Sequence, residues 1–354
     1  MKKHTLYTTF VFLLLSVQFV IGQDKGTVKI DALVSKALAN NVIGVDNKRP
    51  FSIYLPPSYS TSNKRYPVMY LLHGTGDNHL NFVDDKEKYA TIQGLMDAGV
   101  SSNRFGEMIV VTPNENTQWG GSFYVNSSAT GNWEDFTVNE LVNHIDTNYR
   151  TIAKAESRAI VGHSMGGFGA ITLAMKHPEV FSVAYGMNSG FLSFTDDLNP
   201  NNPDVKKFIE AKTIEELLAT KSQISIGMLM VAQAFSPNPA NLPFYADKPY
   251  KIQGNEIVAN PVAYSKWLEY DVVKMAEKNK ENLLKLRGIK FDCGDEEHIK
   301  LIEINSRLLS KKLTALGVPH QFEQYNGDHR NRLWGLKGRI YNEVLPFVFD
   351  NLVK

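Results

Sequence analysis

Residues 159–170 read AIVGHSMGGFGA, and the organisation of the rest of the chain follows from this stretch. The apolar run Ala159–Val161 predicts a strand, and Gly167–Lys176 has apolar residues at helical spacing before a proline ends the helix. Between them lies a G-x-S-x-G motif centred on Ser164. The serine of such a turn has strained backbone, so the residues two before and two after it must be small, and here both are glycine. The stretch predicts a nucleophile at Ser164.

A glycine-rich turn between a strand and a helix can also bind phosphate, and G-x-S-x-G occurs by chance in unrelated chains. A dinucleotide-binding turn would require G-x-G-x-x-G, and Ser164 interrupts that pattern. The start of the following helix favours negative charge that develops near the serine. The context therefore favours a catalytic serine over a phosphate-binding turn.

Composition narrows the class of protein. The chain has 354 residues, a net charge of +1 and 43% hydrophobic residues, which fits one large α/β domain with a long insertion. The near-neutral charge and the lack of a basic tract argue against nucleic acid as a partner, because phosphate binding needs clustered Lys and Arg. We find neither paired histidines at helical spacing nor a cysteine cluster, so no metal and no cofactor are expected.

The N-terminus predicts export. Lys2 and Lys3 precede an apolar run over residues 10–21, which is typical of a cleaved secretory signal over residues 1–22 and of a secreted or periplasmic protein. The run is shorter than the ~20 residues that a spanning helix needs, so no stable membrane anchor is expected. Cys293 is the only cysteine, which excludes an intrachain disulfide. Residues 23–354 are expected to form the α/β domain.

Further apolar runs predict a mostly parallel sheet covered by helices on both faces. The run 51–55 alternates and ends at two prolines, as an edge strand does, whereas 68–72 is apolar throughout, as a strand buried on both faces should be. The other expected strands are 108–111, 159–161, 183–190, 288–292 and 320–325. Helices are expected over 138–145, where Thr137 and Glu140 form a capping box, and over 167–176, 302–313 and 336–352.

The alternation of strands and helices is interrupted at about 195–285. Within this interval, 205–220 and 261–286 have helical spacing, and several prolines break the segment between them. The interval is short and returns directly to a strand, so a separate domain is disfavoured. We expect a helical cap, inserted at the strand ends, over the site.

Two loops at strand ends supply further candidate site residues. The glycines around Thr75 allow backbone N–H groups to face a cavity, so the N–H groups of Thr75 and Met165 are candidates for an oxyanion hole. His73 beside them is expected to be structural. In the loop after 108–111, Trp119 and Tyr124 could line an acyl or aryl pocket, or fold back onto the core.

Four further features of the sequence belong together: YLPPSY at 54–59, LLHG at 71–74, EL at 140–141 with ID at 145–146, and the extended serine motif from 162 to 170. Together they resemble the Putative esterase family of α/β-hydrolases, which includes esterase D, feruloyl esterases and mycolyltransferases. The similarity runs from about residue 35 to the end of the chain, and the cap segment, including 235–239, resembles secreted bacterial members. The resemblance implies an α/β-hydrolase fold.

The fold implied by this resemblance places an acid and then a histidine after the serine in chain order. His329 follows the last expected strand and is the candidate base; His298 is the rival, but it lies out of order. The family usually has an aspartate three residues after the glycine at 294, where this chain has Glu297. Glu297 is therefore the candidate acid, with Asp295 as the alternative.

Two further aspartates are assigned other roles. Asp292, within its strand, is expected to cap or satisfy buried backbone, and Asp328, beside the candidate base, is expected to be a turn residue.

The resemblance implies a secreted serine hydrolase of carboxylic esters, acting on acyl or feruloyl esters of plant polysaccharide fragments. The expected partner is a small-molecule or oligosaccharide ester. Acyl transfer, peptide hydrolysis and a non-catalytic binding role on the same fold stay open, as does the oligomeric state. The signal segment disfavours an S-formylglutathione hydrolase.

Overall fold

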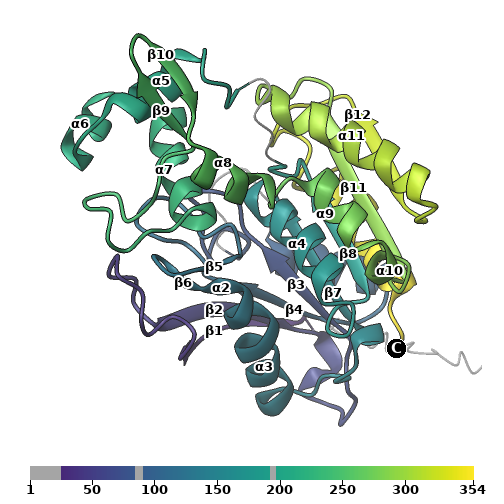
Figure 1. Ribbon diagram of the computed structural model, residues 1–354. Coiled ribbons are helices and arrows are strands. Elements are labelled where there is room, and N and C mark those ends of the chain that lie inside the picture. Colours follow the sequence, from purple (N-terminus) through teal and green to yellow (C-terminus); the bar gives the residue numbers. More distant parts are fainter. Residues whose placement is uncertain (1–24, 84–90, 192–196) are drawn as a thin grey trace, which may run out of the picture.

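The computed structural model describes residues 25–83, 91–191 and 197–354 (Figure 1). The expected signal segment, residues 1–22, lies outside these residues. Eight strands form the central sheet in the order β1-β2-β4-β3-β7-β8-β11-β12. Their bounds are β1 Thr27–Val34, β2 Lys48–Leu55, β3 Val68–Leu72, β4 Ile109–Pro113, β7 Arg158–His163, β8 Val183–Met187, β11 Gly288–Gly294 and β12 Gln321–Tyr325.

The sheet is mostly parallel, as the apolar runs predicted. Strand β2 pairs antiparallel with both β1 and β4, and every other neighbouring pair is parallel. The assignment of 51–55 to an edge strand was wrong, because β1 pairs along the outer side of β2. Strand β1 was missed because most of its side chains are solvent-exposed, so its sequence has no continuous apolar run.

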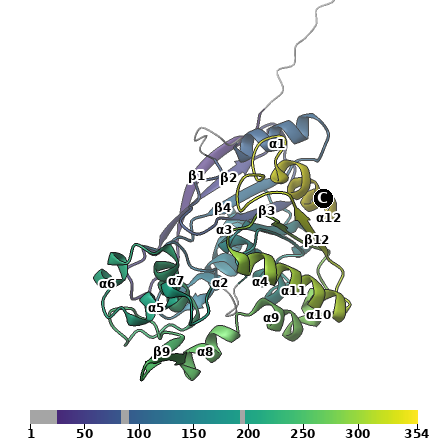
Figure 2. The ribbon, with the colours of Figure 1, turned by 90° about the horizontal axis from the view of Figure 1, so that it is seen from above.

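Alternate side chains of the parallel strands pack into two separate cores, one on each face of the sheet. In β3, Tyr70 and Leu72 belong to one core, whereas Met69 and Leu71 belong to the other. Figure 2 shows α1 (Ile92–Ser101) and α12 (Leu345–Asn351) on one side of the sheet. The helices α4 (Met165–Lys176), α9 (Val272–Lys278) and α11 (Lys300–Leu316) lie on the opposite side. The mostly parallel sheet with helices on both faces is thereby confirmed.

The helix expected to begin at the Thr137 capping box starts earlier. It runs through α2 (Trp133–Asp135), the π-helical turn η2 (Phe136–Leu141) and α3 (Val142–Asn148). Thr137 lies inside it and donates to the carboxylate of Glu115 at 2.5 Å and to the Trp133 carbonyl at 2.9 Å. Glu140 instead accepts hydrogen bonds from residues 35–37. The capping box was wrong because both side chains have distant partners.

The interval expected to form the cap contains more elements than its sequence pattern suggested (Figure 1). The two expected helical stretches are divided, since backbone turns interrupt each of them, and a β-hairpin lies between them. The elements are α5 Pro203–Glu210, α6 Ile214–Ala219, α7 Gln223–Phe235, β9 Tyr250–Gln253, β10 Glu256–Ala259, α8 Pro261–Leu268, α9 and α10 Lys280–Leu283. Phe235 of α7 packs edge-on against Phe123, with ring centroids 5.2 Å apart, and this contact joins α7 to the loop after β4.

The remaining elements are short. They are η1 Pro57–Tyr59, β5 Asn126–Ser127, β6 Gly131–Asn132, η3 Ala155–Ser157 and η4 Ile340–Val344. The closing helix, expected over 336–352, begins only at η4 and continues as α12. Among the helices of the described ranges, none has the length and apolar character needed to cross a bilayer.

Candidate active site

The turn at Ser164 has the strained geometry that its sequence predicted. Ser164 lies between β7 and α4 with φ 57° and ψ −118°, in the region of positive φ that non-glycine residues rarely adopt. A Cβ atom on Gly162 would lie 2.1 Å from the Gly166 carbonyl oxygen, and one on Gly166 would lie 2.3 Å from the Leu72 carbonyl oxygen. The glycines are therefore required by close backbone approaches on both sides of the serine.

A buried histidine–carboxylate pair lies at the carboxyl ends of β11 and β12. His329 Nδ1 and Glu297 Oε2 are 2.6 Å apart, and Glu297 is fully buried. The other carboxylate oxygen, Oε1, accepts a hydrogen bond from the Ile299 N–H at 3.0 Å. Burial raises the pKa of Glu297, but the hydrogen bond and charge of His329 more than offset this effect, so that pKa lies below its ordinary value. The carboxylate is thus ionised at neutral pH and orients the imidazole.

The candidate nucleophile, Ser164, and the candidate base, His329, belong to adjoining turns. His329 packs against His163, the residue before Ser164, with ring centroids 4.7 Å apart. The Ser164 hydroxyl makes no hydrogen bond with any residue in the described ranges. In unliganded hydrolases the hydrogen bond between serine and histidine is often long, and it shortens when substrate binds. The arrangement brings serine, histidine and glutamate to the same edge of the sheet.

The turn after β3 lies directly against the serine. A Cβ atom on Gly74 would lie 3.3 Å from the Ser164 Cβ atom. The Gly76 N–H donates to the Gly120 carbonyl at 2.7 Å and fixes the turn. Within the described residues, the N–H groups of Thr75 and Met165 donate to no backbone carbonyl. Both N–H groups thus lack a backbone partner among the described residues and stay candidates for an oxyanion hole.

The other candidate acids have different partners, whereas the rival histidine adjoins the same pair, with His298 Nδ1 3.4 Å from Glu297 Oε1. Asp295 Oδ1 accepts from the Gly327 N–H at 3.1 Å, and Asp328 Oδ1 accepts from two turn N–H groups at 2.7 Å. Asp292 pairs with Arg339 Nε at 2.9 Å. His298 is mostly exposed and lies edge-on to the His329 ring, 5.7 Å away between centroids. Among these carboxylates, the one that contacts the imidazole of His329 belongs to Glu297.

The two aromatic candidates for substrate contact differ in exposure. Trp119 is half-buried, and its buried indole Nε1 has no hydrogen-bond partner among the described residues. Tyr124 is fully buried and donates its hydroxyl to the His73 carbonyl at 2.8 Å. This placement favours a supporting role for Tyr124 beneath the turn that carries Thr75, and leaves Trp119 as the more accessible ring.

His73 has the structural surroundings expected for it. Its Nε2 accepts a hydrogen bond from the Glu115 N–H at 2.9 Å, and burial lowers its pKa to about 4. The ring is therefore neutral at physiological pH. Across the described residues, no three His, Cys, Asp or Glu side chains gather in a way that could hold a metal ion.

Sequence reasoning missed two residues that bind the backbone of the candidate base, His329. His163 and Asn188 both donate to the carbonyl oxygen of His329, at 2.9 and 3.2 Å. His163 was assigned to the serine turn without a role, and Asn188 was included only as part of a strand. The one available signal was a polar residue directly after a buried parallel strand, where functional side chains gather.

Comparisons with known proteins identify the family. A family model described as Putative esterase matches residues 44–337. Esterase MT1326 of Mycobacterium tuberculosis is 34% identical over 135 residues, which are 38% of this chain and 27% of that protein. An endo-1,4-beta-xylanase/feruloyl esterase of Xylanibacter ruminicola is 28% identical over 166 residues, which are 45% of this chain and 21% of that protein. The matches thus span about a quarter of the length of these two relatives.

A solved ferulic acid esterase shares the fold over nearly the whole chain. Its TM-score is 0.64 at 25% sequence identity, and the superposition covers 94% of this chain and 100% of that one. The family model matches well over half of the present sequence, including the serine turn, the glutamate and the histidine. The chain therefore belongs to the Putative esterase family of α/β-hydrolases.

Proposed function

We propose that the protein is a serine hydrolase of carboxylic esters in which Ser164, His329 and Glu297 form a catalytic triad. The observation that carries the proposal is the buried 2.6 Å contact between Glu297 and His329. The His329 ring packs against His163, the residue before Ser164, and Ser164 has a φ of 57°. A purely binding protein has no need of a strained serine, an oriented imidazole and two free N–H groups in one place. Membership of the Putative esterase family supports the same reaction.

In the proposed reaction, Ser164 Oγ attacks the ester carbonyl while His329 Nε2 takes the hydroxyl proton. The Met165 and Thr75 N–H groups bind the oxyanion of the tetrahedral intermediate. His329 then gives the proton to the leaving alcohol, and the acyl group stays on Ser164. A water molecule attacks the acyl-enzyme, His329 takes one proton from it, and the acid leaves as Ser164 recovers its hydroxyl.

The proposed substrates are acyl or feruloyl esters of plant polysaccharide fragments. Support comes from the relatives, since one is a xylanase/feruloyl esterase and the solved neighbour is a ferulic acid esterase. The indole N–H of Trp119 has no partner among the described residues, and the carbonyl of the adjacent Gly120 contacts the turn that carries Thr75. We therefore propose this N–H as a donor for an oxygen of such a substrate. Residues 1–22 support a secreted or periplasmic location, where such fragments are found.

The segment 195–285 is proposed to act as a cap that sets substrate length. A Cβ atom on Gly121 would lie 2.2 Å from the Met165 sulfur and 3.4 Å from that of Met230, so α7 reaches the loop beside the oxyanion hole. A shortened cap should change selectivity among acyl chains more than activity on the smallest acetate ester. An unchanged selectivity profile in a stable deletion variant would restrict the segment to a structural role.

A substrate panel tests the proposed function. Wild-type protein and Ser164→Ala should be assayed on p-nitrophenyl acyl esters, methyl ferulate and acetylated xylan, with circular dichroism to match the folded fractions. Wild-type hydrolysis of at least one ester, lowered by several orders of magnitude in Ser164→Ala, supports the proposal. Transfer of the acyl group to an added alcohol, or cleavage of peptides alone, would favour the acyltransferase or peptidase alternative.

A further inference from the structure

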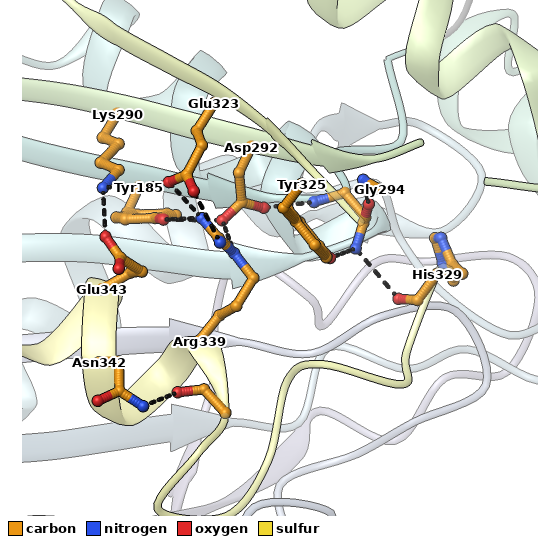
Figure 3. Close-up of polar contacts among 12 residues, drawn as sticks. Tyr185, Lys290, Asp292, Gly294, Glu323, Tyr325, His329, Arg339, Asn342 and Glu343 are labelled. Carbon is orange, nitrogen blue, oxygen red and sulfur yellow. Dashed lines mark hydrogen bonds and ion pairs between the residues drawn. The ribbon is translucent and has the colours of Figure 1, made fainter. Parts of the chain in front are cut away.

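Asn188 lies at the point where three parallel strands end together. It follows β8, which pairs with β11, and β11 pairs in turn with β12. Its side chain is fully buried, and its φ of 40° lies in the left-handed region that asparagine tolerates better than most residues. Figure 3 shows Gly294, Tyr325 and His329 grouped at this edge of the sheet.

The Asn188 amide uses its oxygen and both of its N–H donors. Its Oδ1 accepts from the Gly294 N–H at 2.8 Å. Its Nδ2 donates to the Tyr325 hydroxyl at 2.7 Å and to the His329 carbonyl at 3.2 Å. A primary amide has two donors and one acceptor oxygen, so each of these groups is engaged. One side chain therefore ties the end of β11, the end of β12 and the turn that carries the base.

Two of these partners, the Gly294 N–H and the His329 carbonyl, are main-chain groups of the turns that carry Glu297 and His329. Gly294 starts the turn that leads to Glu297, and a Cβ atom on Gly294 would lie 2.1 Å from the Gly327 carbonyl oxygen. The two turns are thus in direct contact. His163 Nε2 is the second donor to the His329 carbonyl, which now receives two hydrogen bonds. The backbone of His329 is fixed by these donors, and its ring is fixed by Glu297.

A buried ion pair between Asp292 and Arg339 lies next to Asn188. The Asn188 N–H donates to the Asp292 carbonyl at 3.1 Å, and the Asp292 carboxylate accepts from Tyr185 at 2.7 Å and from Arg339 at 2.9 Å. Arg339 also contacts both carboxylate oxygens of Glu323 (Figure 3). The charges are paired and hydrogen-bonded, as burial requires. The strand ends that hold Asn188 are therefore rigidly connected to one another.

We propose that Asn188 is a positioning residue for catalysis, which holds the turns of Glu297 and His329 so that the imidazole meets Ser164. The inference rests on the proposed ester hydrolysis. Asn188 does not contact the imidazole, and it acts through the backbone of the two turns. Because a misplacement of about 1 Å costs about 10²-fold in rate, loss of this amide should lower kcat and leave substrate binding intact.

The test compares Asn188→Gly with a matched control, Asn41→Gly. Glycine keeps the positive φ at position 188 and removes the side chain together with its three hydrogen bonds. The Asn41 amide also makes three hydrogen bonds to backbone, two to carbonyls at 2.8 Å and one from the Val45 N–H at 2.7 Å, but it lies in the β1–β2 connection. With p-nitrophenyl acetate, Asn188→Gly should lower kcat about 10²-fold with KM within about threefold, whereas Asn41→Gly should lose stability and keep kcat.

The outcomes separate this role from the proposed function. An active wild type, an inactive Ser164→Ala and an Asn188→Gly enzyme with normal kcat would overturn the positioning role and leave ester hydrolysis intact. Equal losses of kcat in the Asn188 and Asn41 variants would also overturn it. A wild type without ester hydrolysis would overturn both. If Asn188→Gly does not fold, Asn188→Asp keeps the acceptor and removes the donors; a normal kcat in that variant would again refute the role.

Discussion

Replacement of Glu297 by glutamine tests the proposed triad at its least expected member. Glu297 Oε1 accepts from the Ile299 N–H, and Oε2 contacts His329 Nδ1. A glutamine that keeps its oxygen on the Ile299 N–H must place its NH₂ group against Nδ1. That nitrogen then becomes an acceptor, and Nε2 carries the proton that should have come from Ser164. The base would be held in the wrong tautomer.

The contacts of Glu297 with Ile299 and His329 set upper and lower limits on the expected fall in kcat. In the wrong tautomer, kcat should fall about 10⁴-fold, which corresponds to about 5 kcal/mol in the activation barrier. If the amide rotates instead, the imidazole keeps the competent tautomer, but the Ile299 N–H is left unsatisfied at a cost of about 1–3 kcal/mol. We therefore expect kcat to fall by about 10²- to 10⁴-fold in Glu297→Gln, with little change in KM.

Asp295→Asn is the matched control, because Asp295 accepts from the Gly327 N–H and an asparagine oxygen can accept the same bond. It should lose less than about tenfold in kcat. Both variants should be assayed with p-nitrophenyl acetate at equal folded fraction, established by circular dichroism. Substantial activity in Glu297→Gln, together with a loss of about 10³-fold or more in Asp295→Asn, would refute the assignment of the acid.

Three further predictions concern packing, pH and substrate contact. Gly166→Ala should destabilise the fold by about 1–3 kcal/mol or more in urea unfolding, because its Cβ would meet the Leu72 carbonyl. Gly227→Ala is the control, because a Cβ atom there would meet no described atom within 4 Å beyond its chain neighbours and its own helix backbone. Equal stabilities of the two variants would contradict the reasoning. Burial raises the pKa of Glu115 from 4.5 to about 8, so the stability that this group contributes is complete below its unfolded pKa and is lost as the pH rises through the folded value. Unfolding free energies of wild type and Glu115→Gln should therefore diverge between about pH 4.5 and 8 in favour of the variant, and parallel profiles would exclude this titration. Trp119→Phe removes an indole N–H that has no partner in the described part of the chain, and it should raise KM for methyl ferulate more than for p-nitrophenyl acetate; an equal change for both esters would argue against a substrate contact.

The parallel strands could be predicted because they are buried on both faces. Runs such as 68–72 are apolar at every position, which few other structures require. Strand β1 has no such run, since it is mostly exposed and pairs only with β2. The capping box at Thr137 failed for a different reason. Its sequence satisfies a local rule, but Thr137 and Glu140 bond to residues distant in the chain, which no local pattern reveals.

The candidate site shows the same division between local and distant information. Ser164 could be identified from its neighbours in the sequence, because Gly162 and Gly166 flank it at the spacing that such a turn requires. Glu297 and His329 followed from chain order and family resemblance. Asn188 could not be found, since its role depends on three partners more than 100 residues away that only the assembled sheet brings together. The supports of the site were therefore less predictable than its reactive groups.

The most direct test of the central claim is to trap the acyl-enzyme. Wild type and Ser164→Ala should each be mixed with an excess of a p-nitrophenyl ester. The amount of nitrophenol released in the initial burst should be compared with the intact mass of the quenched protein. We predict a burst of about one equivalent and a mass increase of one acyl group on the peptide that contains Ser164, both absent in Ser164→Ala. Ester hydrolysis by a folded Ser164→Ala protein at near wild-type rate, or an acyl group on another residue during turnover, would contradict the account.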